Sequence, residues 1–254
     1  MIKSNYLNFV LFLIFCIILC SCGDMENNSS KTITRTRNNS IKVYPQEYKS
    51  VIEDYKSIVK FRISKDFEIK YNNKEFPDVS ENLKAQIYNN NNEQLQYNWW
   101  NMIADMTDYI ESPSIDSFGY VLKDINSDSL NELFWVDEKN NILAIFTIQN
   151  GNVKLIDSFG PRHSVIINDK NEFIVRSSGG ADYVEYEIMS LDSNSNLKII
   201  AKFGTDGRDK NNNSVLFYEI INDKKQSVSE KRFDELQSQY PFVKSNEGDK
   251  VTVL

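Results

Sequence analysis

The sequence predicts an α+β domain in which N-terminal helices precede a mostly antiparallel multi-strand sheet and a C-terminal helix. Two observations carry this prediction. Before residue 110, apolar residues recur at spacings of three and four, which is typical of amphipathic helices. After Pro113, short β-branched and aromatic runs alternate with polar turns, which is typical of strands joined by hairpins. We expect a meander, as in a partial barrel or a propeller-like sheet.

Three segments of the helical part, 45–110, have the pattern of helices. Pro45 precedes apolar residues at helical spacing, and Pro is favoured in a first turn, so we expect a helix from Pro45 to Phe61. A weaker pattern covers Asp78–Asn89. The longest pattern covers Glu93–Ile110, and Ser112-Pro113 ends it.

Nine apolar runs in the β part, 117–222, predict the strands. In order they are FGYVLKDI, ELFWVDE, ILAIFTIQ, VKLIDSF, HSVIIND, EFIVRSS, YVEYEIMSL, LKIIAKFG and VLFYEII. Asn150-Gly151 separates the third run from the fourth, and this dipeptide strongly favours a two-residue hairpin turn. A closing helix is expected at 228–239, with Ser229 near its start.

The first residues predict export and a lipid anchor. Every residue from Phe9 to Cys20 is apolar, but this run is shorter than the roughly 20 residues that a bilayer core requires. It has the length of a signal-peptide apolar region. The following Leu19-Cys20-Ser21-Cys22 resembles the lipobox of bacterial lipoproteins, although Ala, Ser or Thr is commoner at position 20. The resemblance implies cleavage before Cys22 and a diacylglyceryl group on its thiol.

The lipobox divides the chain into three parts. Residues 1–21 would be a lipoprotein signal peptide, 22–43 the lipid anchor and a disordered polar linker, and 44–254 an α+β domain on the extracytoplasmic side of the cell membrane. An ordinary secretory signal and an uncleaved anchor are the alternatives.

Cysteine content and charge exclude several classes of protein. The three cysteines stand at 16, 20 and 22, so residues 23–254 form no disulfide scaffold. The single histidine, His163, cannot complete a zinc module without cysteines. With 29 Lys and Arg against 36 Asp and Glu, the net charge of −7 argues against a nucleic-acid partner.

The segment Asp124–Glu132 is the best candidate for a metal site. Side-chain oxygens alternate at Asp124, Asn126, Asp128 and Glu132, and Leu130 could add its carbonyl, which together would suit a hard cation such as calcium. The pattern resembles the Asp-x-Asp-x-Asp-Gly-x-x-Glu calcium loops of integrin-like and related bacterial surface repeats, but Ser129 stands where Gly is usual. The alternative is a turn without metal, because Asp and Asn are good turn formers.

A wider resemblance supports the same location. FGYVLKDINSDSLNELFW at 118–135, SSGGAD at 177–182 and the final SEKRFDELQSQYP look like uncharacterised lipoproteins and surface proteins of low-GC Gram-positive bacteria. That resemblance implies location and style of fold, and it implies no activity.

The leading functional hypothesis is a non-catalytic binding or structural role at the cell surface, with an unidentified protein or glycan as partner. Trp99 and Trp100 cannot both face one core, so one ring is either exposed for binding or packed on a neighbouring helix. A second hypothesis is a hydrolase with His163 as base, Ser178 as nucleophile and Asp182 as orienting group. A third is an accessory lipoprotein of an envelope or transport assembly.

Overall fold

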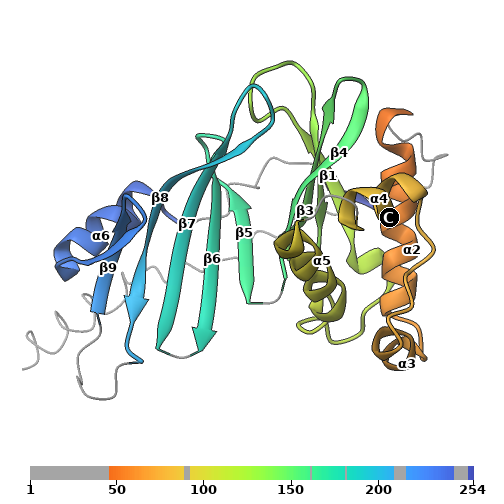
Figure 1. Cartoon of the computed structure of the whole chain (residues 1–254), viewed down its shortest axis with the longest axis horizontal. Coiled ribbons are helices and arrows are strands. Elements are labelled where there is room, and N and C mark those ends of the chain that lie inside the picture. Colours follow the sequence, from red (N-terminus) through yellow and green to blue (C-terminus); the bar gives the residue numbers. More distant parts are fainter. Residues whose placement is uncertain (1–45, 89–91, 161, 181, 209–215, 243–250) are drawn as a thin grey trace, which may run out of the picture. The chain divides into compact units, whose positions relative to one another are not determined.

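The computed structural model describes residues 46–88, 92–160, 162–180, 182–208, 216–242 and 251–254. The signal peptide, Cys22 and the linker predicted for 1–43 lie outside these residues. The described residues form helices, two antiparallel sheets and a helix after the second sheet, which confirms the predicted α+β class (Figure 1). In this part of the chain, none of the helices has the length and apolarity needed to cross a membrane.

The helical part contains one short 3-10 helix and four α-helices. Their bounds are Gln46–Tyr48 (η1), Lys49–Arg62 (α2), Phe67–Asn72 (α3), Glu81–Tyr88 (α4) and Glu93–Asp105 (α5). The sequence pattern does not predict α3, which is too short to show a helical period. α5 ends before the predicted Ile110, because the amides of Asp108 and Ile110 bond to carbonyls three residues earlier and the chain tightens into turns.

The first sheet follows a second 3-10 helix, Ile115–Ser117 (η2). Its strands are Gly119–Lys123 (β1), Glu132–Val136 (β2), Ile142–Gln149 (β3), Asn152–Ser158 (β4) and Thr252–Val253 (β11). They lie in the order β11-β1-β2-β3-β4, and every pairing is antiparallel. β11 comes from far along the chain and is too short to be predicted from a pattern.

The second sheet is an uninterrupted antiparallel meander. Its strands are His163–Ile167 (β5), Phe173–Gly180 (β6), Tyr183–Leu191 (β7), Leu197–Asp206 (β8), Leu216–Ile221 (β9) and Lys224–Ser227 (β10). They lie in the order β10-β9-β8-β7-β6-β5. β10 is not predicted by the sequence, because the segment KKQS has no apolar residue.

Two local signals place the ends of elements. Asn150 and Gly151 have φ angles of 53° and 76° between β3 and β4, as a two-residue hairpin turn requires. Ser229 caps the helix Glu230–Gln239 (α6), where its hydroxyl accepts a 3.2 Å hydrogen bond from the amide of Arg232. The cap begins α6 two residues after the predicted start at 228.

Three apolar cores hold these layers together. Trp135 faces the core that the first sheet shares with α2, α4 and α5. The preceding Phe134 faces the other way, and its ring meets that of Phe173 in the core between the sheets, at 6.0 Å between centroids. α6 covers the far face of the second sheet, where Phe233 meets Phe203. Both faces of the first sheet are therefore covered, and every residue of β2 is buried.

The paired tryptophans of α5 both pack inside the helical part. Trp99 is fully buried beside Trp135. Trp100 is half-buried, and its ring meets those of Tyr71 and Phe76 edge-on at 5.8 and 5.2 Å. The alternative in which the second tryptophan packs on neighbouring helical elements is therefore the one that the structure shows.

Substituting Gly204 should destabilise the second sheet strongly. A Cβ at this position would collide with the carbonyl oxygen of Val184 and lie 2.7 Å from the hydroxyl of Tyr218. We expect Gly204→Ala to lower the free energy of unfolding by about 3 kcal/mol, measured by urea denaturation. Gly151→Ala is the matched control, because its Cβ would meet nothing within 4 Å and only its positive φ is unfavourable. Equal losses for the two variants would contradict this close packing.

Candidate functional site

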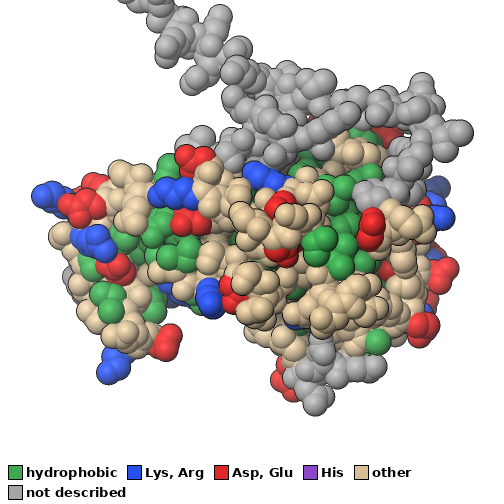
Figure 2. Space-filling model, turned by 90° about the horizontal axis from the view of Figure 1, so that it is seen from above, with side chains coloured by type: hydrophobic (Ala, Val, Ile, Leu, Met, Phe, Trp, Pro, Cys, Tyr) green, Lys and Arg blue, Asp and Glu red, His purple; other side chains and the backbone are tan. Residues whose placement is uncertain are grey.

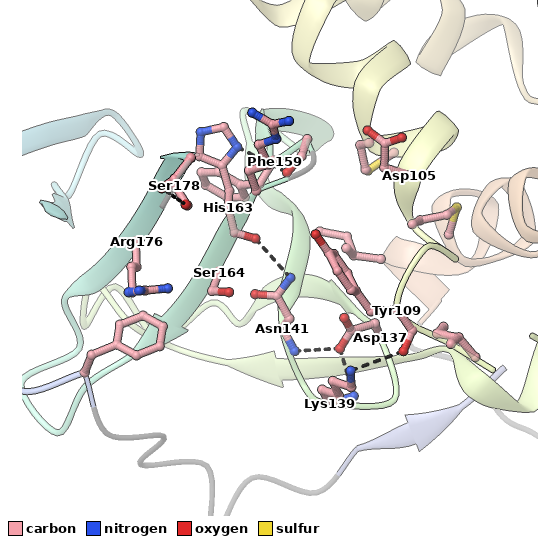
Figure 3. Close-up of a pocket in the computed structure, with 18 residues that line it drawn as sticks. Asp105, Tyr109, Asp137, Lys139, Asn141, Phe159, His163, Ser164, Arg176 and Ser178 are labelled. Carbon is pink, nitrogen blue, oxygen red and sulfur yellow. Dashed lines mark hydrogen bonds between the residues drawn. The ribbon is translucent and has the colours of Figure 1, made fainter. Parts of the chain in front are cut away.

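A cavity of about 540 Å³ lies where the edge strand β5 meets the turn between β2 and β3 and the end of α5. Figure 3 shows the side chains that line it. The volume is within the range of small-molecule binding sites. The cavity unites three segments that are far apart in the sequence, so only the folded chain creates it.

One wall of the cavity is apolar. It consists of Met102, Met106 and Ile110 from α5 and the turns after it, together with Leu143 of β3 and Phe159 after β4. All five side chains are buried or nearly so. Methionine is flexible and polarisable, so this wall can adapt to ligands of different shape.

Charged side chains line part of the remaining wall. Lys139, Arg162 and Arg176 provide three cations, and Asp105 and Asp137 provide two carboxylates. Asp137 stabilises its own turn, because it accepts the amides of Lys139 at 2.9 Å and Asn141 at 2.8 Å. Lys139 donates to the carbonyl of Tyr109 at 3.2 Å and so joins this turn to the segment after α5.

Asn141 occupies the open edge of β5. Its amide oxygen accepts the backbone N–H of Val165 at 2.6 Å, and its amide nitrogen donates to the carbonyl of His163 at 3.5 Å. A side chain thus makes the hydrogen bonds that another strand would make. This arrangement covers part of an edge that could otherwise pair with a foreign chain, and it fixes one side of the cavity.

His163 and Ser178 both line the cavity, but the structure does not pair them. His163 lies directly opposite Ser177 in the sheet, so the side chain of Ser178 leaves β6 on the other face. The hydroxyl of Ser178 donates to the carbonyl of Gly180 at 3.2 Å, and Nδ1 of His163 lies 3.1 Å from the carbonyl of Gly160. Asp182 is exposed and does not line the cavity.

The bond to Gly160 selects one tautomer of His163. A carbonyl oxygen only accepts, so Nδ1 carries the proton and Nε2 presents a lone pair in the neutral ring. The hydroxyl of Ser178 donates to Gly180 and forms no hydrogen bond with this nitrogen. The described residues thus lack the hydrogen bond between His163 and Ser178 that nucleophilic catalysis by this pair would use.

The predicted calcium loop is ordered by its own side chains. Asp124 accepts the amides of Ser127 and Ser129 at 2.8 and 3.0 Å, and Asp128 accepts that of Leu130 at 2.8 Å. The amide nitrogen of Asn126 donates to Asp128 at 3.0 Å. Both serines have positive φ, which serine adopts rarely, so these bonds hold a strained turn.

Glu132 is directed inward from the end of this loop. It is fully buried, and its two oxygens accept the amide of Ile125 at 3.1 Å and the hydroxyl of Thr147 at 3.0 Å. Within the described ranges, no three His, Cys, Asp or Glu side chains are grouped to hold a metal. A calcium ion here would therefore need Asn126 and the carbonyl of Leu130, as the sequence pattern predicts.

The cavity residues other than His163 and Ser178 could not be found by motif. Arg162, Arg176 and Asn141 are unremarkable in the sequence, and they meet only because β5 lies at the edge beside the β2–β3 turn. The sequence does hold one clue, which is the turn Lys139-Asn140-Asn141. Its last residue, Asn141, comes directly before the apolar run that forms β3.

Comparisons with known proteins give no family. No protein-family model matches the sequence, and no curated protein matches it. A solved structure described as a Xanthomonas type IV secretion system related protein aligns with 48% of this chain and 61% of its own, at 15% identity and a TM-score of 0.30. A TM-score this low does not show a shared fold, so nothing about this chain follows from that protein.

Replacing Glu132 by Gln tests the cost of its buried charge. Burial raises the pKa of Glu132, although the hydrogen bonds from Ile125 and Thr147 lower it. Because the folded state keeps this proton to higher pH than the unfolded state, stability is lost as pH rises from the unfolded pKa through the folded pKa. E132Q lacks this loss, so its stability relative to wild type should increase across that interval, by up to about 1.4 kcal/mol per pH unit.

Urea denaturation between about pH 4 and pH 8 measures this difference. Glu138→Gln is the matched control, because Glu138 is exposed in the turn that follows β2. It should show no comparable increase. Parallel stability curves for wild type and E132Q would contradict the assigned cost.

Calcium binding by the Asp124–Glu132 loop stays a prediction. We expect the wild-type melting midpoint to be higher in millimolar calcium than in chelator, with a gain of about 2.7 kcal/mol where calcium reaches 100 times its Kd. Asp128→Ala should abolish this gain, because it removes one of the oxygen ligands. Identical wild-type midpoints would show that the loop is only a turn.

Proposed function

We propose that this protein is a lipid-anchored extracytoplasmic binding protein, with Cys22 as the lipidation site and the cavity beside β5 as the binding site. The observation that carries the binding role is the cavity itself. It joins an adaptable apolar wall to convergent polar groups, which is the usual composition of a ligand site.

The arrangement of polar groups supports binding more than hydrolysis. His163 and Ser178 each bond to a backbone carbonyl, and they leave the second sheet on opposite faces. A nucleophile and its base must come within hydrogen-bond reach of each other. Here the groups can each contact a ligand, but neither activates the other.

The anchor rests on the N-terminal pattern, which the cavity does not test. The apolar run ending at Cys20 and the lipobox-like Leu19-Cys20-Ser21-Cys22 support lipid attachment. Charge gives no alternative explanation, because the chain has a net charge of −7 and acidic and basic side chains are interspersed on the face shown in Figure 2. Anionic lipid headgroups would not attract such a surface.

Replacing Cys22 by Ser tests the anchor. In cells fed labelled palmitate, the wild type should incorporate the label and sediment with membranes. The variant should lose the label and accumulate as the uncleaved precursor, because the thiol that receives the lipid is absent. Cys16→Ser is the matched control and should behave as wild type. Label that persists in the Cys22→Ser protein would exclude this lipidation site.

Filling the cavity tests the binding role. The chain 23–254, which starts after Cys22 and so carries no lipid, contains every described element. We expect it to bind the neutral fluorescent probe N-phenyl-1-naphthylamine saturably, and Met106→Trp should weaken this binding at least tenfold by occupying the apolar wall. Tyr97→Trp is the control, because Tyr97 is 65% exposed and does not line the cavity. Absence of saturable binding in the wild type would overturn the proposed function.

A further inference from the structure

We infer that the cavity takes an organic anion, whose acidic group lies at Arg162 and Arg176 and whose apolar body lies against the wall formed by α5 and Phe159. This inference rests on the proposed binding function and adds the chemical class of the ligand. Carboxylate, sulfonate and phosphate groups share the required chemistry.

The arginines of the cavity differ from the other arginines that the structure describes. The three outside the cavity each lie within ion-pair distance of a carboxylate, at 3.4, 2.8 and 2.9 Å for Arg62–Asp108, Arg208–Asp206 and Arg232–Glu219. In the cavity wall, Arg162 and Arg176 form no ion pair with a described carboxylate. Arg162 is nevertheless near enough to Asp105 for its charge to act on that carboxyl, whose pKa burial raises and Arg162 partly lowers. On a chain with more acidic than basic residues, two guanidinium groups left unpaired in one cavity indicate an anion from outside the chain.

Arg176 is the better placed of the two to hold an acidic group. It comes from the middle of β6, where its cross-strand neighbours are Ser164 and Tyr186, and neither of these carries a charge. Its side chain is half-buried, so it has lost part of its hydration. A guanidinium presents parallel N–H donors that match the oxygens of an acidic group, and such charge-assisted bonds are stronger in a partly dry site.

The remaining charges of the cavity restrict where the acidic group lies. Asp137 and Lys139 are held in the β2–β3 turn, the first by backbone amides and the second by the carbonyl of Tyr109. Asp105 lies at the α5 side, opposite Arg176 (Figure 3). An anion is therefore repelled from the α5 end and attracted to the β5–β6 end.

The apolar wall selects the rest of the ligand. Met102, Met106 and Ile110 come, like Asp105, from α5 and the turns after it, and their side chains offer no hydrogen-bond donor. A small inorganic anion would leave this wall without contacts, whereas an organic acid with an aromatic or aliphatic body would cover it. The site is thus matched to an amphipathic acid.

Two probes that differ by one acidic group test the inference. 8-Anilinonaphthalene-1-sulfonate has the same rings as N-phenyl-1-naphthylamine and adds a sulfonate. With the lipid-free chain 23–254, we expect the sulfonate to bind at least tenfold more tightly than the neutral probe. Arg176→Gln should remove at least tenfold of the sulfonate affinity and change the affinity for the neutral probe less than twofold. Octanoate should displace the sulfonate at a lower concentration than octan-1-ol does.

Controls separate this inference from the proposed function. Arg208→Gln removes an arginine outside the cavity and should leave both affinities unchanged. Arg162→Gln changes an exposed residue and serves as a second test if Arg176→Gln lowers the melting midpoint. Equal affinity for the two probes, or a sulfonate affinity that neither cavity variant changes, would overturn the anion inference while leaving the binding cavity intact. Saturable binding of neither probe would overturn both.

Discussion

The arrangement of the layers depends on the burial of β2, and above all of Trp135. Its ring stacks on that of Tyr55 from α2, with centroids 4.4 Å apart and planes within 5°. The hydroxyl of Tyr55 donates to the carbonyl of Val136 at 2.9 Å, so the same residue fixes the helix to the strand by packing and by a hydrogen bond. Phe134 faces the second sheet. The consecutive residues Phe134, Trp135 and Val136 of β2 therefore connect the helices, the first sheet and the second sheet.

Much of the fold could be predicted because its local signals agree with its packing. The nine apolar runs became β1 to β9, since each run has a face that one of the cores buries. The Asn150-Gly151 turn and the Ser229 cap follow from backbone chemistry that needs no distant partner. β10 and β11 have no such signal. β10 follows β9 across the turn Asn222-Asp223 but contains no apolar residue, and β11 is two residues long with its partner far back in the chain.

The site was predictable only in fragments, because it is a product of topology. His163 and Ser178 could be singled out by residue type, but their placement on opposite faces of the sheet follows from the register of β5 with β6. Arg176 has an ordinary sequence context. It stands out only in the folded chain, because the residues opposite it on the neighbouring strands carry no carboxylate. The Asp124–Glu132 pattern correctly indicates a tight acidic turn, whereas the inward direction of Glu132 depends on Thr147 of another strand.

The pairing of β11 with β1 has a consequence for the order of assembly. Gly119 pairs with Val253, so this contact closes a loop that contains the whole of the second sheet. Loop-closure entropy grows with the logarithm of loop length, so closing this loop costs about 4 kcal/mol. Closing the short turn of a hairpin costs far less. We therefore expect strands β1 to β4 and their helices to assemble early and the edge at β11 to close late. The cavity needs α5, the first sheet and β5 together, so an occupied cavity would report that both sheets have docked.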